Sequence, residues 1–172
     1  MFVKKIGLSV FGIALLAGGI LTGCSEDEAG SSTQKASAET KKEAKKKEYN
    51  IGDTISAEGL KIKLSKASYT SPAEFADASK GKVLTIELNV ENNSDDSALI
   101  DNTDFNLYDK DGNQLDEYFG YDDLAISGDI NKGKKKSGKL YYDVPKADSY
   151  ELIYKPSFSW GDKEYKINVK PQ

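Results

Sequence analysis

From Glu48 onward, apolar residues recur at every second position rather than at every third or fourth. The clearest runs of this kind occupy residues 60–64, 84–90, 140–144, 150–154 and 165–169. Successive side chains of a β-strand point to opposite faces, so each run has one apolar face and one wetter face. The pattern predicts half-buried strands of an antiparallel sheet, and no stretch of this part of the chain shows the periodicity of an amphipathic helix.

Turn-forming residues separate the apolar runs. Glycine, asparagine and aspartate gather at 52–53, 92–96, 111–113, 131–133 and 160–162. Seven or eight short strands in about 125 residues predict an all-β fold, an antiparallel two-sheet sandwich over residues 48–172. A chain of that length can close one core without disulfides, and the single cysteine of this chain cannot form an internal one.

The first 23 residues have the pattern of an export signal. Two lysines precede an apolar run over Ile6–Leu21, and the segment ends directly before Cys24. The tetrapeptide Leu21–Cys24 resembles the lipobox that ends bacterial lipoprotein signals. The resemblance implies that residues 1–23 are removed and that Cys24 receives a diacylglyceryl group and often an amide-linked palmitate-type chain. The mature chain would then be lipid-anchored on the outer side of the cell membrane. An uncleaved signal anchor is the alternative.

The segment that follows, residues 24–47, contains no large apolar residue. Such a composition predicts a flexible charged linker, because it cannot bury enough surface to offset the entropy of ordering. Lysines crowd its distal half and could instead bind anionic envelope polymers. Residues 1–47 carry eight lysines and five acids, so residues 48–172 are more acidic than the chain as a whole, whose formal charge is −4. That sign excludes a typical nucleic-acid binder.

The composition also argues against an enzyme. The chain has no histidine and no arginine, so it lacks the commonest general base and the usual fork for phosphate. We therefore expect no catalytic residues, no cofactor and no metal site. A carboxylate-dependent enzyme acting on envelope polymers is the alternative, as is a structural or stress-related envelope protein. The segment Asp109–Asn113 is interpreted as a hairpin turn, with a weak cation site near Asp109 and Asp111 as the other hypothesis.

One loop combines aromatic and acidic side chains. Tyr118, Phe119 and Tyr121 interleave with acids that include Asp122 and Asp123. Aromatic anchors dominate the energetics of many interfaces, so these five residues are the predicted partner-binding loop of a monomeric domain. The partner would be an unknown envelope protein or polymer. The competing hypothesis is that the rings cap one end of the sandwich with their hydroxyls at the rim. Binding rings would leave the melting temperature nearly unchanged when Tyr118 and Tyr121 become alanine, whereas capping rings would not.

Several motifs, taken in order, resemble the domain family DUF4352 of exported lipoproteins from Gram-positive bacteria. They lie at Ile51–Thr54, Leu84–Ser94, Asp104–Gly112, Gly133–Pro145 and Tyr150–Tyr154. The resemblance covers about Tyr49–Val169. It implies an immunoglobulin-like sandwich similar to that of small secreted antigens. It supplies no general activity and no catalytic residues, so the function of the domain stays open at this stage.

Overall fold

The computed structural model describes residues 48–157, 159 and 161–172, so the predictions for the leader, for Cys24 and for the linker 24–47 lie outside the described residues. The elements are β1 (Tyr49–Asn50), β2 (Thr54–Ala57), β3 (Leu60–Thr70), β4 (Lys82–Asn92), β5 (Ala98–Asp101), the 3₁₀ turn η1 (Asn102–Asp104), β6 (Phe105–Tyr108), β7 (Asp116–Glu117), β8 (Ser127–Ile130), β9 (Lys135–Val144), β10 (Tyr150–Tyr154) and β11 (Tyr165–Val169). Within this part of the chain no helix is long and apolar enough to span a bilayer.

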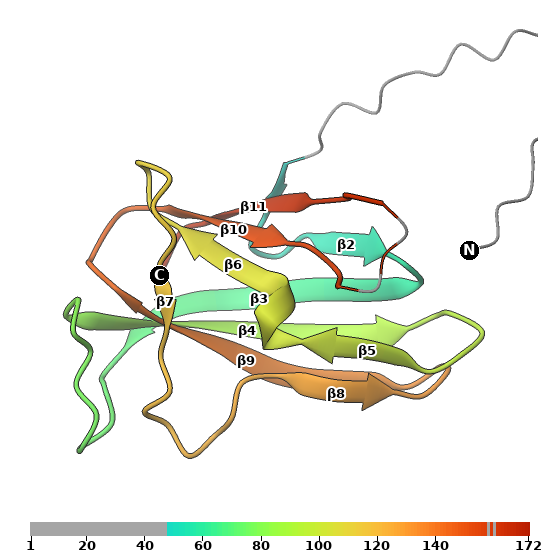
Figure 1. The fold of residues 1–172 in the computed structure, drawn as a ribbon, viewed down its shortest axis with the longest axis horizontal. Helices are drawn as coiled ribbons and strands as arrows, with labels where there is room; N and C mark the ends of the chain where they lie inside the picture. The colour runs from blue at the N-terminus through green and yellow to red at the C-terminus, as the bar shows by residue number, and fades with distance from the viewer. Residues whose placement is uncertain (1–47, 158, 160) are drawn as a thin grey trace, which may run out of the picture. The chain divides into compact units, whose positions relative to one another are not determined.

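The strands form two packed sheets and a small ribbon (Figure 1). One sheet has the order β1-β11-β10-β6, the other has the order β2-β3-β4-β9-β7, and β5 pairs with β8. Every pair is antiparallel except β1 with β11. The predicted all-β, immunoglobulin-like sandwich is confirmed. The described residues hold more strands than the seven or eight expected, because two-residue strands such as β1 and β7 are too short to show an alternation.

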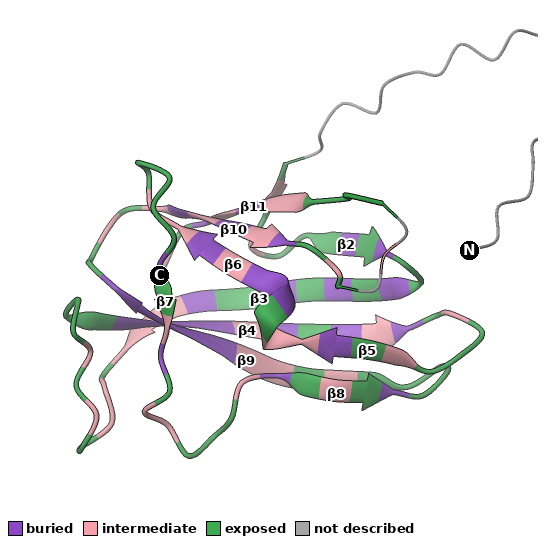
Figure 2. Cartoon of the chain, viewed as in Figure 1, coloured by how far each residue is buried: buried purple, intermediate pink, exposed green. Residues whose placement is uncertain are grey.

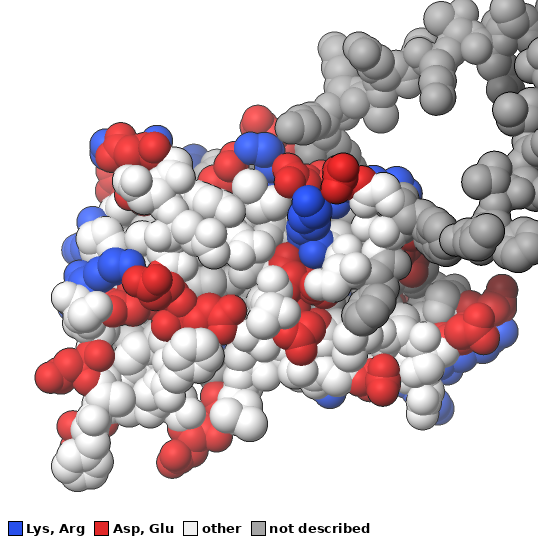
Figure 3. All heavy atoms as spheres, in the orientation of Figure 1, with Lys and Arg blue, Asp and Glu red and all other residues white. Residues whose placement is uncertain are grey.

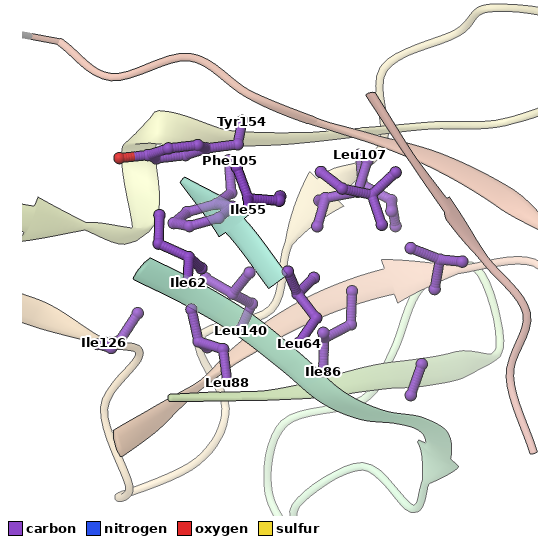
Figure 4. Packing of buried hydrophobic residues seen from close by; sticks show 14 of the residues in the cluster. Ile55, Ile62, Leu64, Ile86, Leu88, Phe105, Leu107, Ile126, Leu140 and Tyr154 are labelled. Atoms are coloured by element: carbon purple, nitrogen blue, oxygen red, sulfur yellow. The ribbon is translucent and has the colours of Figure 1, made fainter. Parts of the chain in front are cut away.

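The core lies between the two sheets, where side chains from both point toward one another (Figure 4). The inward sets predicted from the alternation are buried in every run: Leu60, Ile62 and Leu64; Leu84, Ile86, Leu88 and Val90; Leu140, Tyr142 and Val144; Tyr150, Leu152 and Tyr154; Ile167 and Val169. Tyr165, also expected to point inward, is partly exposed and packs against the edge of this core. Burying one such side chain stabilises a fold by about 1.5–3 kcal/mol, so this shared interior accounts for the pairing of the sheets.

Strand β4 departs from the predicted alternation. Val83 to Ile86 are buried without interruption, and Thr85, expected on the wetter face, is only 6% exposed. Figure 2 shows this continuous burial on β4 and β9 at the end where two long loops lie. Those loops cover the outer face of the five-stranded sheet, so the first half of β4 is buried on both faces. The outer cover forms a second small core of Val83, Tyr118 and Tyr141.

Candidate binding surface

Two loops meet at one end of the five-stranded sheet. The first, the β3–β4 loop, comprises residues 71–81. The second, which we call the arch, comprises residues 118–126 and connects β7 to β8. The arch leaves the edge of β9 where the Tyr118 amide donates to the Tyr141 carbonyl at 2.9 Å, and it returns where the Ile126 amide donates to the Lys139 carbonyl at 2.9 Å. In Figure 1 both loops extend at the lower left.

Tyr118 joins the two loops. Its hydroxyl accepts a hydrogen bond from the Ala73 amide at 2.8 Å and donates one to the Ala76 carbonyl. The side chain is 7% exposed. Gly120 passes so close to this ring that a Cβ added there would lie 2.1 Å from the Tyr118 hydroxyl oxygen and 2.7 Å from the Ala76 Cβ. The absence of a side chain at residue 120 is therefore what lets the arch close over the ring.

Tyr121 turns back over the outer face of the sheet. Its ring meets Tyr118 edge-on at a centroid distance of 5.1 Å and Tyr141 edge-on at 4.9 Å. Its hydroxyl lies 2.8 Å from the hydroxyl of Thr70, which in turn lies 2.8 Å from that of Thr85. Aromatic pairs in this geometry contribute about 0.5–1.5 kcal/mol beyond the area they bury. The three rings bind the arch to the sheet surface.

One acidic residue of the arch, Asp123, is paired with a lysine of β9. Asp123 accepts from Lys139 at 2.8 Å and from the Tyr141 hydroxyl at 2.9 Å. The hydrogen bond from Lys139, with that from Tyr141, holds the pKa of the Asp123 carboxyl below its usual value. Burial, with the hydrogen bond to Asp123, raises the pKa of Tyr141 to about 12. These contacts fix the outer edge of the arch against β9.

The β3–β4 loop is held by Asp143, which is 7% exposed on β9. This carboxylate accepts from the Ser79 hydroxyl at 2.5 Å and from the Lys80 amide at 2.9 Å. Burial alone would raise the pKa of Asp143, but the hydrogen bonds outweigh it and the pKa is lowered. The Lys80 ammonium then pairs with Asp116 at 2.5 Å, which ties the same loop to β7.

Three large apolar side chains remain in water on these braced loops. Phe75 is 94% exposed, Phe119 82% and Leu124 83%. Glu74, Asp77 and Asp122, also exposed, lie beside them in the sequence. In Figure 3 acidic groups and uncharged groups stand side by side at this end of the visible face. We call Phe75, Phe119 and Leu124 the apolar tip.

A small pocket of about 100 Å³ lies beneath the arch. Its lining includes Phe119 and Leu124 from the arch, Leu140 and Tyr141 from β9, and Glu117 from β7. The Glu117 carboxylate accepts from the Asn102 side-chain amide at 2.8 Å. Burial raises the pKa of Glu117, and that hydrogen bond only partly offsets the effect. This mostly apolar pocket thus holds two carboxylates, the half-buried Glu117 and the exposed Asp123, which is paired with Lys139.

The structure separates the residues of the predicted binding loop. Tyr118 and Tyr121 pack against the outer face of the sheet, and their hydroxyls bond with Ala73, Ala76 and Thr70, an arrangement that agrees better with rings that cap the domain than with free rings. Phe119 and Asp122 are exposed, and Asp123 is exposed but paired. That the loop contacts a partner stays a prediction.

The hairpin interpretation of Asp109–Asn113 agrees with the geometry. The Asp109 carboxylate accepts from the amides of Asp111 and Asn113 at 2.9 Å and from the Asn113 side chain at 2.9 Å. Gly112 has a φ of 83°, which a glycine adopts at low cost. The Asp109 oxygens are therefore engaged within their own turn.

Sequence reasoning missed Phe75 and Asn102 as members of this surface, and it did not single out Leu124 or Glu117 within the loop that contains them. Phe75 and Leu124 are single apolar residues in polar loops, a signal that could have been noticed. The meeting of Glu117 with Asn102 depends on how β7 lies beside η1, and no local pattern encodes that neighbourhood.

The model of the family described as "Domain of unknown function (DUF4352)" matches residues 49–167. The chain belongs to this family. The match covers nearly the same range as the resemblance drawn from the motifs. The family description assigns no activity, so membership establishes the domain type and leaves its role open.

Relatives agree with this assignment. The chain is 31% identical over 138 residues to the uncharacterized lipoprotein YcdA of Bacillus subtilis; the alignment covers 78% of this chain and 36% of that protein. The crystal structure of YcdA superposes with a TM-score of 0.59 at 27% identity, over 68% of this chain and 38% of that one. The chain thus spans little more than a third of this relative.

Two further structures share the fold. The YjhA protein of Bacillus subtilis superposes with a TM-score of 0.60 at 23% identity, covering 71% of this chain and 99% of that one. The secreted protein MPT63 of Mycobacterium tuberculosis does so with a TM-score of 0.54 at 17% identity, covering 74% and 99%. At these identities the likeness concerns the fold alone.

Proposed function

We propose that the protein is a lipoprotein held on the outer side of the cell membrane of a Gram-positive bacterium through Cys24. The leader-like residues 1–23 and the position of Cys24 directly after them support this proposal. A relative that covers 78% of the chain is itself named a lipoprotein. Two or three acyl chains, each methylene contributing roughly 0.8 kcal/mol, would hold the domain at the membrane.

The anchor is tested by intact-mass analysis of protein purified from membranes. Wild-type protein should begin at Cys24 and carry the added mass of acyl chains. The Cys24→Ser variant should accumulate as an unprocessed precursor or leave the membrane fraction. An unmodified Cys24 on wild-type protein would disprove the lipoprotein assignment.

For the domain itself we propose a non-enzymatic binding module that captures an envelope protein or polymer with the apolar tip. The observation that carries this proposal is the exposure of Phe75, Phe119 and Leu124 on two loops that are braced against each other and the sheet. Large apolar side chains that stay exposed on neighbouring loops are typical of interaction sites. Because the loops are already ordered by their hydrogen bonds, binding would cost less conformational entropy than ordering a free loop.

The buried carboxylates support a non-enzymatic role over the carboxylate-dependent enzyme. In the described part of the chain these are Asp104 and Asp143. Asp104 accepts from the Ser157 amide and hydroxyl, and Asp143 accepts from Ser79 and Lys80. Each carboxylate therefore holds a loop in place.

Crosslinking in living cells tests the binding role. A full-length variant with Phe75→Ser, Phe119→Ser and Leu124→Ser should lose most of the adducts formed by wild type, at least five-fold, with the melting temperature nearly unchanged. Leu99, 39% exposed on β5, provides the control: Leu99→Ser should retain the adducts. Equal adducts from the triple variant and wild type would remove the apolar tip as the interface.

A further inference from the structure

The pocket beneath the arch is too small for a cofactor or metabolite. Its volume of about 100 Å³ compares with roughly 300–1,000 Å³ for typical small-molecule sites. A single unbranched side chain of another molecule fits this size.

The lining determines which side chain would be stabilised. Phe119, Leu124 and Leu140 offer apolar contact along the pocket, and Glu117 and Asp123 each offer a carboxylate. Asp123 is already paired with Lys139, and Asp116, next to Glu117 in the sequence, is paired with Lys80. No ion pair within the described part of the chain involves Glu117. Burial raises the pKa of Glu117 because it destabilises the charged form of the carboxylate. A cation bound beside the carboxylate would stabilise that charged form.

The surrounding charge favours a cationic occupant over a membrane surface. Glu74 and Asp77 on the β3–β4 loop and Asp122 on the arch are exposed beside the apolar tip. Such acids would repel anionic lipid headgroups and polyanionic polymers and would attract a basic protein segment. An apolar side chain that ends in a positive charge is complementary to the pocket lining and to the negative charge of these acids.

We propose that the pocket binds a lysine side chain of a partner protein, with its methylenes against the arch and β9 and its ammonium at Glu117. This inference rests on the proposed binding function and names the chemistry of the partner. The residues of the apolar tip would contact the partner surface around that lysine. Glu117 is then the residue that distinguishes a basic partner from a merely apolar one.

Methyl NMR on the full-length protein in neutral detergent micelles tests the proposal. The probe is Nα-acetyl-lysine methylamide, and the control probe is Nα-acetyl-norleucine methylamide, which has the stem without the ammonium. The lysine probe should shift the methyl signals of Leu124, Ala125 and Leu140 in a saturable way. The norleucine probe should bind at least five-fold more weakly. Equal shifts from the two probes, or no shift with either, would overturn the inference.

Two variants assign the effect to Glu117. Glu117→Gln keeps the shape and a hydrogen-bonding group for Asn102, and it should weaken binding of the lysine probe at least five-fold without lowering the melting temperature. Asp122→Asn removes an equal charge outside the pocket lining and should weaken binding less than two-fold. Equal effects of the two variants would show that the general negative charge of this surface attracts the probe and that no specific site exists.

If lysine binding fails while the apolar tip still forms crosslinks, this inference falls and the binding function stands. Loss of the crosslinks in the Leu99 control as well would count against the function itself.

Discussion

Gly120 is the residue on which closure of the arch depends most directly. A methyl group there would overlap the Tyr118 hydroxyl, so Gly120→Ala must displace either the ring or the β3–β4 loop. We expect a loss of about 1–3 kcal/mol in the free energy of unfolding, as for other overpacked sites. Urea denaturation measures it.

Asp122→Ala is the matched control for that variant, since Asp122 is an exposed residue of the same arch. It should change the free energy of unfolding by less than about 0.5 kcal/mol. A Gly120→Ala variant as stable as this control would mean that the arch does not rest on the Tyr118 ring.

As an element, the arch is packed on the sheet through Tyr118, while Phe119 and Leu124 stay exposed on it. Tyr118→Ala leaves a cavity over Val83 and removes the hydroxyl that Ala73 and Ala76 use. We expect a loss of about 3 kcal/mol, at the lower end for removal of a buried aromatic ring. Phe119→Ala, one residue along but 82% exposed, should be nearly neutral. Thermal melting of the two variants compares them directly.

This expectation reverses the one drawn from the sequence, in which alanine at Tyr118 and Tyr121 would leave stability unchanged. Equal melting of Tyr118→Ala and Phe119→Ala would restore the earlier view.

Strand β4 offers a second test at this scale. Leu88 is 1% exposed between the sheets, and Asn89 beside it is exposed. Leu88→Asp would place an unpaired charge in the core and should abolish cooperative folding, whereas Asn89→Asp should fold as wild type does. A β-type circular dichroism spectrum with a cooperative melt for Leu88→Asp would show that the inward face is assigned wrongly.

For the whole molecule, stability should be nearly constant between about pH 7 and 9, because the chain has no histidine to titrate there. On the acid side, the pKa of Asp143 is lowered from 3.8 by its hydrogen bonds, despite its burial. Its contribution is complete above that value and is lost as the pH falls through the lowered folded pKa.

On the alkaline side, burial raises the pKa of Tyr141 from 10.0 to about 12 and that of Tyr142 well above 10.0. The unfolded chain would release these protons first, so stability should fall as the pH rises above 10. Melting temperatures measured from pH 3 to 11 check both limits. The Tyr141→Phe variant should show a shallower alkaline decline, and an unchanged decline would mean that Tyr141 is not among the groups responsible.

Much of the fold could be predicted because alternation is a local property. The spacing of Leu84, Ile86 and Leu88 alone predicts an inward face, and Asp109 with Gly112 predicts a turn. Less of the candidate surface could be predicted. Tyr118 and Phe119 are both aromatic and adjacent in the sequence, yet Tyr118 is 7% exposed and Phe119 is 82% exposed.

The sequence by itself determined the sandwich class and its inward residues, since the burial of alternate side chains follows from the geometry of a strand. The tertiary structure alone decided that β4 is covered on both faces, that Tyr118 is buried and Phe119 exposed, and that Glu117 lines a pocket. These outcomes depend on which loop crosses which strand. Such contacts join residues more than 40 positions apart, as the bond from Tyr118 to Ala76 does, and no local pattern carries that information.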